Sequence, residues 1–232
     1  MATVQPKTID ENSVISRLLQ HCHRRHYAAK QTIVRQGDAA QDLYYILKGS
    51  VTVTLEDEGG HDLILTYLNR GEFFGEMGWV NESEERSAMV RAKTACEIAH
   101  ISYERLKSLT TIGPELLAEI ASQLALRLRK TNARLGDLAF MDVAGRVSHA
   151  LLDLCKQPDA MTHPEGMQIH VTRTELARLV CCTREMVGRV LTGLEAQGMI
   201  AAYGKTVVVY RERAKPIAFA QTKPSIAAAA AR

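Results

Sequence analysis

The sequence predicts an α+β fold: an N-terminal β jelly roll, then a long dimerisation helix, then a C-terminal winged helix-turn-helix domain. Residues 31–104 read as short alternating strands, residues 114–140 carry an unbroken helical repeat, and residues 172–197 hold two short capped helices. These three observations set the expected boundaries, which are 1–113, 114–140 and 141–213, with an alanine-rich tail at 214–232 that we expect to be disordered.

Short strands separated by turns make up the predicted β domain. Residues 51–55 alternate apolar and polar side chains, the period expected of a strand with one buried face. A turn at 58–60 leads into 63–67 as the second arm of a hairpin, and further strands fit at 87–92 and 95–101. Many short antiparallel strands with glycine turns favour a jelly roll.

The long helix follows from a regular apolar repeat. Between Pro114 and about Phe140 the only glycine is Gly136, and there is no further proline. Apolar residues spaced alternately by four and three over three heptads are typical of helices that pair along their length, so we expect a homodimer. The alternative is a single helix lying on its own β domain. The seam positions, one of them polar, are Leu117, Ala121, Leu124, Leu128, Thr131, Leu135 and Leu138.

The apolar repeat of the long helix ends near Phe140, and we expect Phe140-Met141-Asp142 to form a hinge between this helix and the next. Asp142 is a good N-cap for an amphipathic helix at 143–155, and the composition of 157–166 predicts a loop.

Two short helices joined by a three-residue break come next. Thr172 and Glu175 form a capping box, Thr183 caps the second helix and Gly198 stops it. Residues 201–210 then read as a small hairpin. This order is typical of a helix-turn-helix, and an ordinary helical hairpin is the alternative.

Charge placement on the second of these helices favours contact with DNA. Arg184 and Glu185 open it and Arg189 follows Glu185 by four, so the three side chains can project together. An arginine in the first turn interacts unfavourably with the positive end of the helix dipole, so its presence there indicates a function other than helix stability. That function is base recognition, in which a guanidinium donates two hydrogen bonds to guanine and a carboxylate accepts one from cytosine.

A second candidate site combines the glycine-rich segment 71–78 with an Arg-Ser pair. Gly75 allows close backbone approach, and successive N–H groups there can cradle an anion. Arg86 offers a charged fork to phosphate, Ser87 adds a hydroxyl donor, and Glu76 can accept from a sugar hydroxyl. In the alternative interpretation Arg86 pairs with a neighbouring glutamate on the surface.

Composition narrows the function classes. Twenty-nine Lys+Arg against 26 Asp+Glu leave a net charge of +3, which excludes a uniformly basic coat but not a local basic face. No run approaches the roughly 18 apolar residues of a membrane span, and the N-terminus lacks a signal-peptide layout, so we expect a cytoplasmic protein. No nucleophile elbow, Walker loop or HExxH motif appears, so we do not expect an enzyme.

Residues 71–103 (GEFFGEMGW…ERSAMVRAKTACEIAHISY) strongly resemble the phosphate-binding cassette of the bacterial cyclic AMP receptor protein (catabolite activator) family. The resemblance runs from about His21 to Tyr210 and includes the segments HCH, LYYILKGSV, LAFMDVAGRV, QPDAMTHPEGMQI and TREMVGRVL. It implies a cyclic-nucleotide-binding domain with cyclic AMP as allosteric ligand, and a homodimer that binds a palindromic site in double-stranded DNA and contacts RNA polymerase.

The resemblance also implies roles by position. Gly75 and Glu76 would hold the ribose, and Arg86 and Ser87 the cyclic phosphate. The other implied nucleotide contacts are Thr66 near the base, Arg127 tying the long helix to Glu76, Thr131 at the adenine, and Asn132 toward the nucleotide of the other subunit.

For DNA, the resemblance implies base reading by Arg184, Glu185 and Arg189, and phosphate contact by Thr172 and Arg173. For RNA polymerase, it implies one surface at the loop around Thr162 and a second at His23 and Arg25.

Departures from the family pattern keep alternatives open. The family usually has serine where Asn132 stands, which bears on nucleotide preference, and commonly glycine where Cys181 stands. A cysteine with φ > 0 there would cost roughly 1 kcal/mol of strain. A cyclic di-GMP-responsive or ligand-independent regulator is therefore the alternative, as is a regulatory subunit without DNA contact.

Other sensor chemistries fit the sequence poorly. An iron–sulfur sensor needs several N-terminal cysteines, and only Cys22 precedes residue 96. A haem sensor needs an axial ligand in place of the phosphate segment. The spacing of His21-Cys22-His23 matches no structural zinc site, so we expect no metal.

Overall fold

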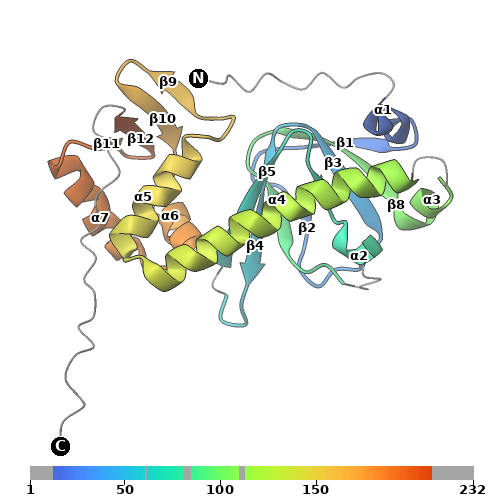
Figure 1. The fold of residues 1–232 in the computed structure, drawn as a ribbon, viewed down its shortest axis with the longest axis horizontal. Helices are drawn as coiled ribbons and strands as arrows, with labels where there is room; N and C mark the ends of the chain where they lie inside the picture. Colours follow the sequence, from blue (N-terminus) through green and yellow to red (C-terminus); the bar gives the residue numbers. More distant parts are fainter. Residues whose placement is uncertain (1–12, 61, 81–84, 110–112, 211–232) are drawn as a thin grey trace, which may run out of the picture.

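The computed structural model describes residues 13–60, 62–80, 85–109 and 113–210. Figure 1 shows a β-rich domain, a long helix that runs along it, and a smaller mixed domain beyond the end of that helix. This order confirms the predicted fold class. The tail at 214–232, for which we predict disorder, lies outside the described residues.

Two four-stranded antiparallel sheets build the N-terminal domain, with strand orders β1-β8-β3-β6 and β2-β7-β4-β5. Side chains from both sheets, among them Ile46, Val51, Leu68 and Ile98, fill one core between them. The strands are β1 His23–Tyr27, β2 Thr32–Val34, β3 Asp42–Lys48, β4 Ser50–Glu56, β5 Asp62–Asn69, β6 Phe73–Phe74, β7 Met89–Ala92 and β8 Cys96–Ser102. Short helices flank them at α1 Val14–Leu19, α2 Met77–Val80 and α3 Tyr103–Lys107.

The β4–β5 hairpin departs from the simple alternation that the sequence predicts. Val51 is fully buried, whereas Val53 is only half-buried and the polar Thr54 is buried. The pairing register shifts between Val53 and Thr54, where β5 carries one extra residue, Leu65. A bulge bends and twists the strands locally, so strict alternation of inward side chains is not kept across it.

The long helix α4 (Gly113–Phe140) contacts its own β domain mainly through residues outside the predicted seam. Leu116 and Ile120 are buried in the β-domain core at 0% and 1% exposure. Leu128 and Leu135 of the seam are instead 61% and 64% exposed. Among the seam residues, Leu124 packs partly against this core, whereas the seam residues further along the helix leave an apolar face uncovered within the protomer.

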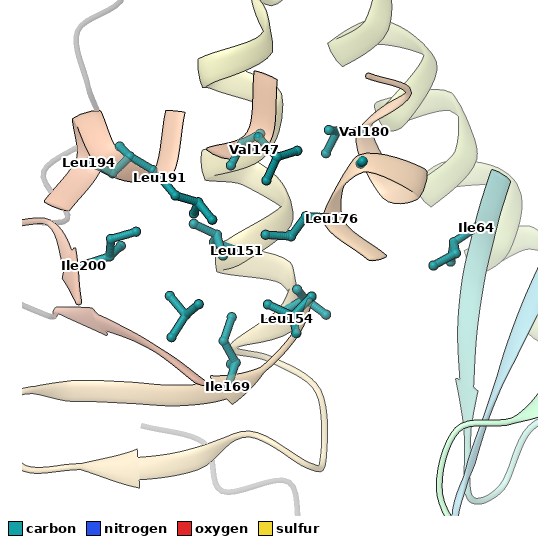
Figure 2. Close-up of a cluster of buried hydrophobic side chains, with 14 of the residues drawn as sticks. Ile64, Val147, Leu151, Leu154, Ile169, Leu176, Val180, Leu191, Leu194 and Ile200 are labelled. Atoms are coloured by element: carbon teal, nitrogen blue, oxygen red, sulfur yellow. The ribbon is translucent and has the colours of Figure 1, made fainter. Parts of the chain in front are cut away.

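The C-terminal domain packs three helices on a small sheet of order β11-β12-β10-β9. Leu151, Leu176 and Leu191, one from each helix, meet in its core (Figure 2). The predicted helices and final hairpin are present. The elements are α5 Val143–Leu154, β9 Met161–His163, β10 Gly166–His170, α6 Arg173–Val180, α7 Arg184–Ala196, β11 Ile200–Tyr203 and β12 Thr206–Tyr210.

The prediction of a plain loop at 157–166 is wrong in its second half. Met161–His163 form the edge strand β9, which pairs antiparallel with the start of β10 across a turn at Pro164-Glu165. The polar composition of the segment carries no alternating pattern, and the pairing comes from the β10 backbone beside it. Thr162 therefore lies exposed on a strand.

Cys181 ends α6 in the left-handed region, with φ 53° and ψ 58°. Its backbone N–H donates to the carbonyl of Ala177, so the turn is closed in the way that a C-terminal glycine usually closes it. A side chain at this φ costs about 1 kcal/mol relative to glycine.

We expect Cys181→Gly to stabilise the protein, because it removes that strain at an exposed position. Thermal unfolding should shift upward by about 2–4 °C. Cys182→Gly is the matched control, and it should lower the unfolding temperature because Cys182 packs partly against the domain core. An unchanged or lower temperature for Cys181→Gly would contradict the presence of strain.

Candidate functional site

Arg86 points into the β domain and is only 8% exposed. Its Nη1 donates to the Gly75 carbonyl at 3.3 Å and to the Tyr103 hydroxyl at 3.0 Å, and its Nη2 donates to the Asp42 carbonyl at 2.9 Å. The guanidinium carbon also lies 5.4 Å from the ring centroid of Tyr44. Each of these partners is neutral, so they hold the guanidinium in place without cancelling its charge. A surface position, which the alternative interpretation needs, is excluded by this burial.

Gly75 is required by its surroundings. Its φ is +79°, and an added Cβ would lie 2.7 Å from Arg86 Nη1 and 2.9 Å from the Asp42 carbonyl oxygen. Ser87 is exposed beside this segment, and its Oγ donates to the Met77 sulfur at 3.4 Å. The structure therefore brings Gly75, Arg86 and Ser87 together, as the sequence predicts.

Glu76 supplies a buried carboxylate at the same place. Its Oε1 accepts from Arg127 Nη1 of α4 at 3.0 Å, and the side chain of Arg127 also donates to the Phe73 carbonyl. The Oε2 atom is buried and has no hydrogen-bond partner among the described residues. A buried carboxylate oxygen without a donor is costly, so this atom is suited to a hydroxyl group of a ligand.

Thr131 lies on α4 between two residues that contact the β domain. Arg127, one turn before it, pairs with Glu76 as described, and the guanidinium of Arg134, one turn after it, donates to the Leu65 carbonyl. Thr66 is the next residue after Leu65 on β5. No hydrogen bond joins Thr131 and Thr66 among the described residues, and the place of both at the nucleotide base stays a prediction.

Gln123 is a further residue of this site that the sequence analysis does not single out. Its Nε2 donates to the Gly71 carbonyl at 3.0 Å, and its Oε1 accepts from the Phe73 N–H at 2.9 Å. The only signal in the sequence is its place one turn before Arg127 on the same helix face. Asn132, by contrast, is exposed and points to no described partner within the protomer.

The second site lies on α7. Thr172 caps α6 by accepting from the Glu175 N–H at 3.1 Å, and Thr183 caps α7 by accepting from the Met186 N–H at 3.2 Å. These caps fix where both helices begin, so that the start of α6 faces the first turns of α7. Six residues line one open hollow on this surface: Arg173, Arg184, Glu185, Gly188, Arg189 and Thr192.

The residues expected to contact RNA polymerase lie apart from both sites. Thr162 is exposed on β9 of the C-terminal domain, and His23 and Arg25 are exposed on β1, an edge strand of the β domain. Their exposure fits a contact surface, and their role stays a prediction.

No three His, Cys, Asp or Glu side chains of the described ranges gather as a metal site requires. At Cys22, burial raises the thiol pKa to about 11, which disfavours the thiolate that binds metals. No helix in that part of the chain is long and apolar enough to cross a bilayer.

A β domain with a buried arginine beside a glycine-rich segment, linked by a long helix to a helix-turn-helix with exposed arginines, is the arrangement of a ligand-responsive DNA-binding regulator. The family described as "Cyclic nucleotide-binding domain" matches residues 24–111, and "Bacterial regulatory proteins, crp family" matches residues 169–200. The chain belongs to the Crp family of bacterial regulatory proteins. This assignment confirms the resemblance on which the sequence analysis relies.

Several relatives have known names. The cAMP-activated global transcriptional regulator Vfr of Pseudomonas aeruginosa is 54% identical over 86% of this chain and 94% of its own. The cAMP-activated global transcriptional regulator CRP of Salmonella typhimurium is 54% identical over 84% of this chain and 93% of its own. Among solved structures, the c-di-GMP responsive global regulator CLP of Xanthomonas campestris matches with a TM-score of 0.81 and 47% identity, covering 85% of this chain and 98% of that one.

Proposed function

We propose that this protein is a cyclic AMP-activated transcription regulator of the cytoplasm. Cyclic AMP binds in the β domain and aligns the two helix-turn-helix domains of a homodimer with the major groove of a palindromic promoter site. The observation that carries the proposal is Arg86, a buried guanidinium held by neutral oxygens beside a glycine whose Cβ would close the cradle.

Each part of the nucleotide has a matching group. Arg86 and Ser87 hold the cyclic phosphate, because a charged fork and a hydroxyl are donors that an anion accepts. Glu76 receives the ribose hydroxyl at its unpartnered Oε2, and Gly75 lets the sugar approach the backbone. Thr66 and Thr131 contact the base, and Asn132 reaches the nucleotide bound to the other subunit. The bound nucleotide supplies the negative charge and the hydroxyl donor that these groups accept.

Cyclic di-GMP is the second candidate, favoured by the likeness to the c-di-GMP responsive regulator of Xanthomonas campestris. The presence of Ser87 next to Arg86, where its hydroxyl can donate to the same cyclic phosphate, favours the mononucleotide. The two relatives named as cAMP-activated support the same choice.

Calorimetric titration with cyclic AMP, cyclic GMP and cyclic di-GMP separates these candidates. The operator is first selected from random duplexes with cyclic AMP-loaded protein, and its binding is then measured with each nucleotide. We expect cyclic AMP to bind and to raise DNA affinity at least tenfold, with no turnover of the nucleotide on incubation. Equal operator binding with and without nucleotide would contradict activation, and selective activation by cyclic di-GMP would establish the second candidate.

The exposed seam of α4 supports the homodimer. Leucines that are 61% and 64% exposed along one stripe are what a parallel partner helix would cover.

We expect Leu128→Glu combined with Leu135→Glu to give a monomer, because four charges would then meet in a dry interface. Sedimentation equilibrium measures the mass directly. The matched control is Leu126→Glu, which changes a leucine that is 48% exposed on the same helix but lies off the seam, and it should remain dimeric. A dimer that survives the double substitution would place the interface elsewhere.

On DNA, Arg184, Glu185 and Arg189 read bases, and Thr172 and Arg173 contact phosphates. The surfaces at Thr162 and at His23 with Arg25 contact RNA polymerase. All of these residues except the partly covered Thr172 are exposed, as contact with a macromolecule requires.

A further inference from the structure

The C-terminal domain has little covalent constraint on its orientation. Only Met141 and Asp142 separate the end of α4 at Phe140 from the start of α5 at Val143. Two residues fix the distance between the helices but leave several backbone rotations open. The direction in which α7 points must therefore be set by non-covalent contacts.

The β domain provides apolar contacts of this kind. Ile64 and Tyr67 of β5 are 4% and 6% exposed, and both belong to the core cluster of the C-terminal domain. Figure 2 shows Ile64 extending from β5 beside the α6 end of that cluster. Two side chains of the ligand-binding domain are thus buried against the DNA-binding domain.

Two polar contacts join the same strand to α6. The Tyr67 hydroxyl donates to Glu175 Oε1 at 2.6 Å, and Arg178 Nε lies 2.7 Å from Asp62 Oδ1. Burial, with the nearby Glu175 carboxylate as the second cause, raises the pKa of Tyr67 far above its usual range, so the hydroxyl remains a neutral donor.

A second pair of contacts lies beside these. Asn69 donates to the Gln157 side chain at 3.1 Å, and Lys93 Nζ lies 2.8 Å from Asp159 Oδ2. The Lys93 ammonium also lies 4.3 Å from the ring centroid of Tyr67. The side chain of Lys93 is only 14% exposed, so solvent screens this ion pair less than one on the open surface.

The contacts of Tyr67 with Glu175 and of Asp62 with Arg178 use the side of α6 that faces away from the proposed DNA-contacting surface. At about 100° per residue, Glu175 and Arg178 lie about 140–200° around the helix from Arg173. Arg173 lines the hollow on α7, together with Arg184 and Arg189. The β domain therefore contacts the DNA-binding domain on the side opposite its proposed DNA-contacting surface, which stays exposed.

We propose that Asp62, Ile64 and Tyr67 of β5, together with Glu175 and Arg178 of α6, form an interdomain clamp that aims α7 at DNA. Thr66, expected at the nucleotide base, stands directly before Tyr67, and Arg134 of α4 binds the carbonyl of Leu65 directly before Thr66. Strand β5 thereby connects the nucleotide pocket to α6 within one subunit, by a route separate from the hinge at Met141-Asp142. The clamp residues are positioning residues, and the proposal rests on the proposed function.

A double-mutant cycle tests the Tyr67–Glu175 contact. Tyr67→Phe and Glu175→Ala should each weaken operator binding by cyclic AMP-loaded protein about five- to tenfold, because the first removes the donor and the second the acceptor of a charge-assisted hydrogen bond. The double variant should cost little more than either single one, since the partner is already lost. Cyclic AMP affinity should change less than threefold. Additive losses would show that the two residues act separately and would overturn this contact.

A charge exchange tests the Asp62–Arg178 contact. Asp62→Arg and Arg178→Asp should each weaken operator binding, and the combined exchange should recover most of the loss by restoring the pair in reverse. Glu58→Arg is the matched control, because it makes the same charge change at an exposed position of the same hairpin. Absence of recovery in the exchange variant would overturn the contact.

A readout without nucleotide or DNA separates the clamp from the proposed function. Phe140 is 89% exposed at the hinge, and chymotrypsin cleaves after phenylalanine when the backbone can open. We expect Asp62→Arg to be cleaved there several-fold faster than the natural sequence and than Glu58→Arg, with the exchange variant slowed again. Equal cleavage rates would overturn the clamp even if cyclic AMP activates DNA binding. Faster cleavage would support it even if cyclic AMP fails to bind.

Discussion

Arg86→Gln is expected to weaken cyclic AMP binding about 100- to 10,000-fold. Arg86 offers the phosphate a buried positive charge and a forked donor, and two lost charge-assisted hydrogen bonds of about 1.5–3 kcal/mol each correspond to a loss of this size. Operator binding should then no longer respond to cyclic AMP at concentrations that saturate the natural protein. Calorimetry gives the nucleotide affinity, and a gel or anisotropy titration gives the DNA affinity.

Two controls keep this result specific. Arg91→Gln removes the same charge from an exposed position on the adjacent strand β7, and it should bind cyclic AMP normally. Arg86→Lys keeps the positive charge but loses the forked pair of donors, so its cyclic AMP affinity should lie between that of Arg86→Gln and that of the natural protein. If thermal unfolding shows that Arg86→Gln is folded and its cyclic AMP affinity is nevertheless unaltered, Arg86 does not bind the phosphate.

Arg184→Ala is expected to weaken operator binding about 10- to 100-fold and to leave cyclic AMP affinity unchanged. A bidentate arginine–guanine contact contributes about 1–3 kcal/mol of discrimination, and alanine removes all of it. The loss should disappear for an operator in which the contacted base pair is already changed. Competition between the two operators, measured for both proteins, shows whether discrimination is lost.

Arg173→Ala supplies the contrasting case on the same surface. A phosphate contact should weaken binding to all sequences alike and reduce the slope of log affinity against log salt by about 1. Arg129→Ala, at an exposed position on α4, is the control for a general loss of positive charge. An Arg184→Ala protein that still distinguishes the two operators would assign base reading to other residues.

Much of the architecture is predictable because it depends on local pattern. The capping threonines Thr172 and Thr183 have the predicted hydrogen bonds, since a cap and its N–H partner lie three residues apart in the chain. The spacing of apolar residues likewise predicts α4. At the proposed nucleotide site, Gly75 and Arg86 are eleven residues apart, and the chemistry of each residue type already indicates an anion.

The remaining features depend on contacts between distant parts of the chain. Strand β9 forms because the β10 backbone lies beside it, and its own residues show no strand pattern. The register shift between Val53 and Thr54 is decided by pairing with β5. Tyr67 and Glu175 are 108 residues apart, and a tyrosine in a strand and a glutamate in a capping box each have a complete local explanation. No periodicity in the sequence connects them.

The guanidinium of Arg127 has a consequence for the energetics of the whole assembly. It belongs to α4 but is bonded to the carboxylate of Glu76 and the carbonyl of Phe73, so a shift of the helix would act directly on the proposed nucleotide site. Thermodynamic linkage then runs in both directions: by whatever factor the nucleotide tightens promoter binding, the promoter tightens nucleotide binding. A subunit seated on its promoter would accordingly retain its effector at concentrations that leave free protein empty.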